Sequence, residues 1–166
     1  MIEKNNDRLR MSQMNKLLSM RMSTTKYLEQ LAGKKLQVET QFQKELFLNG
    51  DIEIVRVTRL YFDDPGHSVI YSITSIPRRN LSEVETAQIR SGKIPLGKIF
   101  KMTETRDFKK TGMKINAVQD RRITKRLNVQ GTWFYSKEYC LRVGTRRIGS
   151  IKEIFNEESF ARIWDG

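Results

Sequence analysis

The stretch that decides the fold is 51–62, DIEIVRVTRLYF, which comes directly after an Asn49-Gly50 pair. Apolar and polar residues alternate along it, and Asn-Gly is a preferred two-residue turn of a β-hairpin. The segment before the turn, 36–48, also has the pattern of an extended chain, so the two segments predict paired antiparallel strands. A second turn at 63–66, DDPG, leads into the β-branched segment 68–76, which predicts a third strand. Tight turns between three successive strands indicate an antiparallel meander.

Helices are predicted before and after this meander in the sequence. The three segments with helical spacing of apolar residues or with capping signals are 11–20, 24–32 and 80–91. Ser23 or Thr24 can cap the second helix, and Gly33 is suited to end it. Ser82 and Glu85 have the spacing of a capping box at the start of the third helix.

The C-terminal half predicts two further strands, around 131–143 and 147–155. The segment 93–100, KIPLGKIF, is expected to be a loop, and 117–126 is polar and receives no strand or helix. These elements indicate one α+β domain, with helices and flaps packed on a single antiparallel sheet. We expect an N-terminal helical segment, 1–22, before a domain at 23–166.

The composition limits the classes of function. The 166 residues include 31 Lys and Arg against 19 Asp and Glu, a formal net charge of +12. Such a charge suits nucleic acid, an anionic membrane surface or a small anionic ligand. The basic residues are scattered, and the densest run, 121–126, has no interleaved aromatic residues for base stacking, which makes nucleic acid the least favoured partner. No segment approaches the ~20 apolar residues of a membrane helix, and no secretory signal is present.

Metal sites and thiol chemistry find little support. One histidine, His67, and one cysteine, Cys140, are too few for a zinc site, and no carboxylates have calcium-loop spacing. We therefore predict neither a metal nor a cofactor. A Cys140–His67 nucleophile pair is a weaker alternative to a packed thiol. A single cysteine excludes an internal disulfide and favours a reducing compartment, the cytoplasm.

Two charges fall on apolar faces of predicted strands. Alternate residues of a strand share a face, so Arg56 lies among Ile54, Thr58 and Leu60. Glu153 in the same way lies between Ile151 and Phe155. One interpretation is a buried salt bridge between Arg56 and Glu153, or a bulged strand. The other is a cavity in which the arginine holds a carboxylate and the glutamate contacts a hydroxyl.

Several motifs, in a fixed order, resemble a known family. They are STTKYLEQLAGKKLQVETQFQ at 23–43, VRVTRLYFDDPGHSVIYSITSIP at 55–77, LSEVE at 81–85, SGKIPLGKIF at 91–100, TETRDF at 103–108 and RIGSIKEIF at 147–155. This order is similar to that of the chorismate-pyruvate lyases, particularly their cyanobacterial and plastid-encoded branch. The resemblance covers about 23–155.

The resemblance implies roles for five residues. Arg56 matches the arginine that binds the ring carboxylate, and Leu96 matches a position whose backbone amide contacts the ligand. Glu153 matches the carboxylate that meets the ring oxygen destined to become the phenol. Thr24 falls where the family places another backbone contact, often with methionine. Lys137 stands in WFYSKEYCL, where the family usually carries an arginine; it would then offer a point charge rather than a planar fork.

The resemblance implies a cofactor-independent lyase that removes pyruvate from chorismate and leaves 4-hydroxybenzoate, for ubiquinone or plastoquinone biosynthesis. Arg56 and Glu153 would be its catalytic residues, and the plastid stroma is an alternative to the cytoplasm. The main alternative is a non-catalytic ligand-binding domain of the same fold, as in bacterial transcription regulators. The roughly twenty residues before Ser23 are too few for a winged helix, which favours the enzyme. We expect a monomer.

Overall fold

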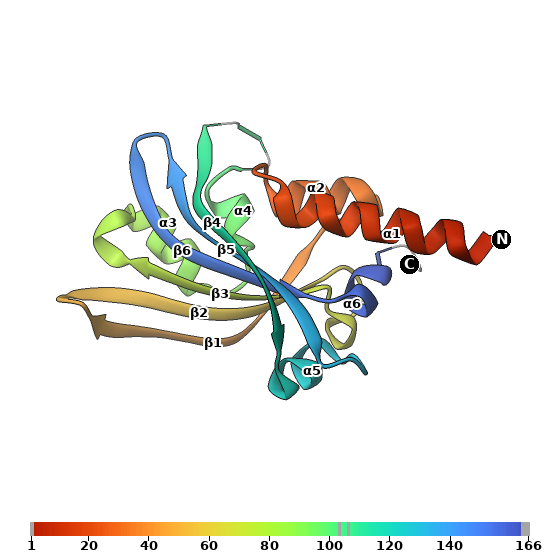
Figure 1. The fold of residues 1–166 in the computed structure, drawn as a ribbon. Coiled ribbons are helices and arrows are strands. Elements are labelled where there is room, and N and C mark those ends of the chain that lie inside the picture. Colours follow the sequence, from red (N-terminus) through yellow and green to blue (C-terminus); the bar gives the residue numbers. More distant parts are fainter. Residues whose placement is uncertain (1, 103, 106, 164–166) are drawn as a thin grey trace.

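A computed structural model describes the backbone of residues 2–102, 104–105 and 107–163, and the side chains from residue 11 onward within these ranges. Met1 and 164–166 of the expected domain division, and Thr103 and Arg106 of the TETRDF motif, lie outside the described residues. Six strands form one antiparallel sheet in the order β1-β2-β3-β6-β5-β4 (Figure 1). The strands are β1 (Gln37–Leu48), β2 (Asp51–Tyr61), β3 (Ile70–Pro77), β4 (Phe108–Gln119), β5 (Trp133–Val143) and β6 (Arg146–Phe155).

The helices lie on both faces of this sheet (Figure 1). They are α1 (Ile2–Ser19), α2 (Thr24–Ala32), α3 (Glu83–Arg90), α4 (Leu96–Ile99), α5 (Arg121–Leu127) and α6 (Glu157–Ala161), with short 3₁₀ turns η1 (Pro65–His67) and η2 (Arg78–Asn80). Helices α1 to α4 and α6 pack on one face, whereas α5 packs on the other, where Ile123 and Leu127 contact Phe134 and Ile154. The predicted α+β fold class is confirmed.

The local signals in the sequence act as expected. Ser23 caps α2 by accepting a hydrogen bond from the Lys26 amide at 3.2 Å, and Gly33 follows the helix with a left-handed φ of 67°. Both halves of the Ser82–Glu85 capping box form at the start of α3. Asn49 and Gly50 both have positive φ, as a type I′ hairpin turn requires, and they form the turn between β1 and β2.

Two expectations for the chain between 93 and 126 were wrong. The expected loop at 93–100 contains the short helix α4, and the segment 117–126 is divided between the end of β4 and α5. The strand β4 was not predicted at all. It is an edge strand with most of its side chains exposed, so its sequence lacks the apolar alternation that marks a half-buried strand.

The core on the helical face consists of two separate apolar clusters. One lies under α1, α2 and α6 and includes Leu17, Leu28 and Phe155. The other lies under α3 and α4 and includes Ile54 and Ile89. A polar band crosses the sheet between these clusters.

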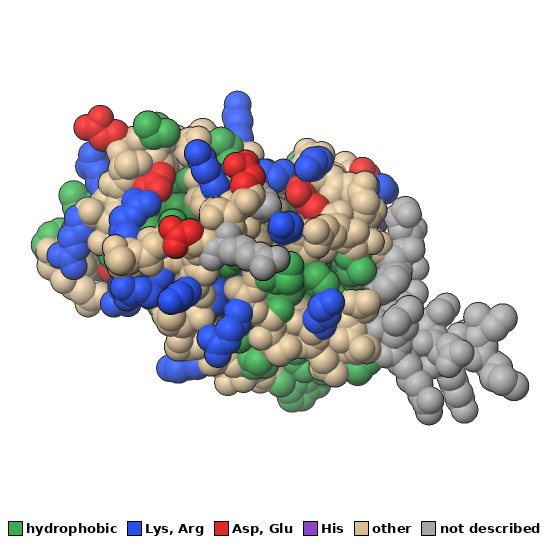
Figure 2. Space-filling model, turned by 90° about the horizontal axis from the view of Figure 1, so that it is seen from above, with side chains coloured by type: hydrophobic (Ala, Val, Ile, Leu, Met, Phe, Trp, Pro, Cys, Tyr) green, Lys and Arg blue, Asp and Glu red, His purple; other side chains and the backbone are tan. Residues whose placement is uncertain are grey.

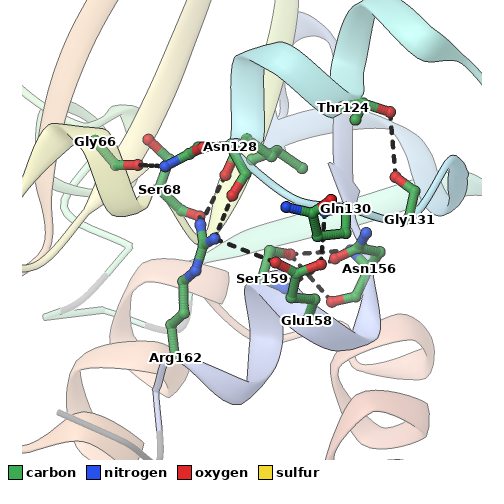
Figure 3. A network of polar contacts seen from close by, with 11 residues as sticks. Gly66, Ser68, Thr124, Asn128, Gln130, Gly131, Asn156, Glu158, Ser159 and Arg162 are labelled. Atoms are coloured by element: carbon green, nitrogen blue, oxygen red, sulfur yellow. Dashed lines mark hydrogen bonds and ion pairs between the residues drawn. The ribbon is translucent and has the colours of Figure 1, made fainter.

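A second polar region fixes the C-terminal helix (Figure 3). Arg162 donates hydrogen bonds to the carbonyls of Leu127, at 2.7 Å, and of Asn128. Glu158 accepts from the backbone amide of Gln130 at 2.8 Å and lies 3.6 Å from the Arg162 guanidinium. These contacts join α6 to the loop that follows α5.

The excess of basic residues in the sequence is visible on the surface (Figure 2). In the face that Figure 2 shows, Lys and Arg side chains are spread among fewer acidic ones. In the part of the chain that the structure describes, no helix has the length and apolar character needed to cross a membrane.

Candidate functional site

The polar band is a row of cross-strand neighbours. The register places Thr58 of β2 opposite Ser72 of β3, Ser72 opposite Glu153 of β6, and Glu153 opposite Lys137 of β5. Arg56 precedes Thr58 by two residues and therefore lies on the same face of β2. All five side chains are buried. The strands thus bring charged groups together that are far apart in the sequence.

A pocket lies between this band and the first turns of α2 and α4. It holds about 510 Å³ of space between atoms, part of which is open solvent. Four of the five predicted site residues line it: Thr24, Arg56, Leu96 and Glu153. The fifth, Lys137, lies behind Glu153. The structure therefore assembles in one place the residues that the sequence singled out.

The close approach of α4 to α2 depends on Gly97. A Cβ atom at this position would lie 2.7 Å from Thr25 Oγ1 and 3.0 Å from Thr25 Cβ, which is too close for any side chain. Pro95 occupies the N-cap of α4, so the backbone amide of Leu96 belongs to the first turn of the helix. Amides of a first turn have no acceptor within the helix. The first turn of α4 therefore presents backbone hydrogen-bond donors at the edge of the pocket.

Arg56 is a buried cation that has no anionic partner. Only 2% of the residue is exposed. Its Nη1 donates to the carbonyl of Ile94 at 3.0 Å and its Nη2 to that of Gly92 at 3.2 Å, while Nε has no acceptor. Among the described residues, no carboxylate lies within 4 Å of the guanidinium. Burial lowers the pKa of Arg56 to about 10, so the group is still charged at neutral pH and is stabilised by any anion that enters.

Glu153 is a buried carboxylate held by three side chains from two elements, α2 and β5. Its Oε2 accepts from Thr24 Oγ1 at 3.0 Å and lies 3.3 Å from Lys137 Nζ, and its Oε1 accepts from the Tyr139 hydroxyl at 3.3 Å. Burial by itself raises the pKa of Glu153, but the charges of Lys137 and Lys110 and the hydrogen bonds from Thr24 and Lys137 lower it more. The carboxylate is therefore ionised at the pocket wall.

The phenol of Tyr139 stays protonated beside this carboxylate. Burial, first, and then the neighbouring charge of Glu153 raise its pKa well above the ordinary value. The hydroxyl therefore acts as a hydrogen-bond donor to Glu153.

Lys137 is engaged by the protein on all sides. Its Nζ donates to the carbonyl of Leu17 at 2.7 Å, contacts Thr24 Oγ1 at 3.4 Å and pairs with Glu153. An ammonium has three donors, and each has an acceptor here. Lys137 thereby ties the end of α1 to the sheet. The ligand-binding role that the resemblance implies for Lys137 stays a prediction.

Lys110 of β4 is a site residue that the sequence analysis missed. It is 1% exposed, and its Nζ donates to Thr24 Oγ1 at 2.9 Å and lies 4.6 Å from the centre of the Tyr139 ring. Burial lowers its pKa to about 7. The available signal was the Lys109-Lys110 pair, since adjacent residues of a strand point to opposite faces and one lysine must point inward.

The charges around the pocket do not balance. Among the residues with described side chains, the buried basic and acidic ones are Arg56, Lys110, Lys137 and Glu153, three basic groups and one acidic group. Arg56 and Glu153 line the pocket, and Lys110 and Lys137 lie directly behind its lining. Buried ionisable groups that are gathered at one cavity are typical of a functional site. The excess of cations favours an anionic ligand.

No protein-family model matches this chain, and no curated protein matches it in sequence. Solved structures do share its fold. PhnF from Mycobacterium smegmatis superposes with a TM-score of 0.62 at 12% identity, over 84% of this chain and 65% of PhnF. This chain thus spans somewhat less than two thirds of that protein.

Two further structures belong to the GntR family of transcriptional regulators. The ligand-binding domain of the one from Bordetella bronchiseptica has a TM-score of 0.55 at 12% identity, over 72% of this chain and 84% of the domain. The regulator from Enterococcus faecalis V583 has a TM-score of 0.51 at 16% identity, over 71% and 91%. The shared architecture is the chorismate-lyase-like fold, with a single antiparallel sheet. At these identities the likeness extends to the fold alone.

Proposed function

We propose that this chain is a small-molecule-binding domain whose pocket takes a cyclic carboxylic acid with a ring hydroxyl. The observation that carries the proposal is the buried guanidinium of Arg56, which lines the pocket and has no carboxylate partner among the described residues. A carboxylate ligand would supply that partner. A ligand-binding domain of a GntR-family regulator has the same fold, which supports this class of function.

The pocket has complementary groups for the two ends of such a ligand. Arg56 keeps Nε free while its other nitrogens are fixed by the carbonyls of Ile94 and Gly92. A guanidinium fixed in this way is already oriented, so little side-chain entropy is lost when a carboxylate binds. Glu153 offers an ionised acceptor for the ring hydroxyl. Apolar side chains such as Leu60 and Ile151 line the space between.

Calorimetric titration with 4-hydroxybenzoate tests this proposal. We expect saturable binding by the unaltered protein and strongly weakened binding by Arg56→Ala. The matched control is Arg59→Ala, which removes the same charge from the same strand, on the face of β2 where Arg59 pairs with Glu39. Binding that is absent from the unaltered protein, or equally weakened in both variants, would contradict the proposal.

A second candidate is turnover of chorismate, and the position of Glu153 favours it. An ionised carboxylate at the wall of a pocket can accept a hydrogen bond or a proton from a ring hydroxyl, and Tyr139 and Thr24 hold this one in place. The sequence resemblance to chorismate-pyruvate lyases assigns Glu153 to the same ring oxygen. Arg56 and Glu153 would then be catalytic residues.

The reaction needs no outside oxidant or reductant. The ring of chorismate loses the proton at the carbon that bears the hydroxyl, and the neighbouring carbon–oxygen bond breaks. The electron pair of that bond leaves with the oxygen as enolpyruvate, whose methylene carbon takes up a proton to give pyruvate. The ring becomes aromatic and keeps its hydroxyl as the phenol of 4-hydroxybenzoate. The protein would orient the substrate and stabilise the moving charge.

Incubation with chorismate separates the two candidates. Equimolar release of pyruvate and 4-hydroxybenzoate, lost in Arg56→Ala and reduced in a folded Glu153→Gln variant, would support the lyase. Full activity of Glu153→Gln would exclude the role assigned to this carboxylate. Binding of 4-hydroxybenzoate without any release of pyruvate from chorismate would leave the binding domain.

A further inference from the structure

Lys110 lies in the middle of the charged groups that adjoin the pocket. Its Nζ faces Lys137 and Tyr139 on β5, Glu153 on β6 and the hydroxyl of Thr24 on α2. The backbone carbonyl of Lys110 accepts a hydrogen bond from Arg21 Nη1 at 3.1 Å. Arg56 also lines the pocket, but it is not among the groups that face Lys110. Lys110 is thus surrounded by groups whose charges respond to a ligand.

The Thr24 hydroxyl links Lys110 to the pocket. This hydroxyl has a single proton, which it donates to Glu153 Oε2 at 3.0 Å. Its lone pairs accept from Lys110 Nζ at 2.9 Å and from Lys137 Nζ at 3.4 Å. Thr24 itself lines the pocket, whereas Lys110 stands behind it. One hydroxyl therefore separates Lys110 from a ligand.

Lys110 has no carboxylate of its own. Lys137 lies at ion-pair distance from Glu153, and among the described residues no carboxylate lies within 4 Å of Lys110 Nζ. When Lys110 is protonated, its positive charge is therefore poorly compensated, because the one described buried carboxylate of the site, Glu153, is already paired. A second negative charge, brought by a ligand, would compensate it.

We propose that Lys110 is a positioning residue that takes up a proton when a carboxylate ligand enters the pocket, and that then holds Thr24 and Glu153 through the shared hydrogen bonds. This inference rests on the proposed function, because it requires an anionic ligand. It adds a fourth charged residue to Arg56, Glu153 and Lys137, and it makes ligand binding depend on pH.

The direction of the proton movement follows from the burial of Lys110. Burial lowers its pKa to about 7, so between pH 7 and 9 most molecules carry a neutral amine. An entering anion stabilises the ammonium form and raises this pKa, so that protons are taken up in that range. Below pH 6 the amine is already protonated, and uptake falls toward zero.

The test is calorimetric titration of the full chain with 4-hydroxybenzoate at pH 8, in two buffers of different ionisation heat. The difference between the two observed heats gives the number of protons taken up. We expect the unaltered protein to take up a fraction of a proton, and Lys110→Met to take up none. Lys109→Met removes the same charge from the exposed neighbour on the other face of β4, and is expected to behave as the unaltered protein.

A second variant separates charge from structure. Lys110→Arg keeps a permanent positive charge, so it is expected to bind the ligand without proton uptake even if Lys110→Met folds poorly. Undiminished proton uptake in Lys110→Arg or in a folded Lys110→Met would overturn the inference. Binding by the unaltered protein without uptake would overturn it as well, while leaving the proposed function intact. Absence of all binding would overturn both.

Discussion

Arg56 and Arg162 use their guanidinium groups in nearly the same way, yet only one of them lies at a pocket. Each donates to backbone carbonyls: Arg56 to those of Ile94 and Gly92, and Arg162 to those of Leu127, Asn128 and Ser68. Arg162 also has a carboxylate nearby, since Glu158 lies 3.6 Å away. The Arg162 side chain remains 19% exposed, whereas Arg56 is almost fully buried and has no such partner among the described residues.

The difference indicates how a structural arginine is distinguished from a ligand-binding one. Carbonyl acceptors orient a guanidinium but do not neutralise it. At the C-terminal helix, Glu158 and solvent compensate the charge of Arg162. At the pocket, the proposed ligand would compensate the charge of Arg56. Four predictions test this contrast.

The largest expected effect is on ligand affinity. Arg56→Ala should weaken the binding of 4-hydroxybenzoate by about 3 kcal/mol, roughly 100-fold, because the ligand carboxylate would be buried without a cation. Arg162→Ala should change the affinity by less than about twofold. Calorimetric titration of both variants measures the contrast, and a similar loss in each would remove it.

The carboxylate at the pocket, Glu153, should contribute more to stability than the one at the C-terminal helix, Glu158. Glu153→Gln leaves Lys137 buried without a carboxylate, and should lower the free energy of unfolding by about 3 kcal/mol. Glu158→Gln removes a carboxylate whose side chain is 42% exposed, and should cost less than about 1 kcal/mol. Urea unfolding of both variants checks this. Equal midpoints would mean that the pocket charges are solvated.

Arg162 should matter for stability in a way that leaves the ligand unaffected. Arg162→Ala removes the donors to the Leu127 and Asn128 carbonyls and loosens α6 from the loop after α5. We expect a loss of about 1–2 kcal/mol in the free energy of unfolding. Arg162→Lys should restore little of it, because one ammonium does not reproduce the planar fork. Full rescue by lysine would indicate that the charge alone is required.

Per pH unit, the smallest expected change is in the pH dependence of stability. Lys110 has a folded pKa of about 7, whereas an unfolded lysine titrates at about 10.4. Between these values the unfolded chain binds more protons, so the free energy of unfolding rises with pH, by at most about 1.4 kcal/mol per pH unit. Lys110→Met should lack this rise. The comparison requires urea unfolding at pH 7, 8 and 9, with Lys109→Met as the control, and parallel curves for all three proteins would contradict it.

Local sequence features determined much of the fold. The Asn49-Gly50 turn, the capping box at Ser82 and the cap at Ser23 act within a few residues, so their structure follows from short-range sterics and hydrogen bonds. The alternation in 51–62 also placed Arg56 on a buried face before any contact was known. The cytoplasmic location, the monomeric state and the quinone pathway stay predictions.

The sequence by itself determined which strand face carries Arg56 and which carries Glu153, because side chains alternate along every strand. Only the tertiary structure decided that these two residues do not pair with each other. The pairing of β5 with β6 places Lys137 opposite Glu153, and the edge strand β4 brings Lys110 next to Thr24. The hydrogen bond between Lys110 and Thr24 joins residues that are 86 positions apart in the sequence. Strand order and register set those contacts, and the local sequence pattern does not. The burial that results from them shifts the pKa values of the charged groups in the site.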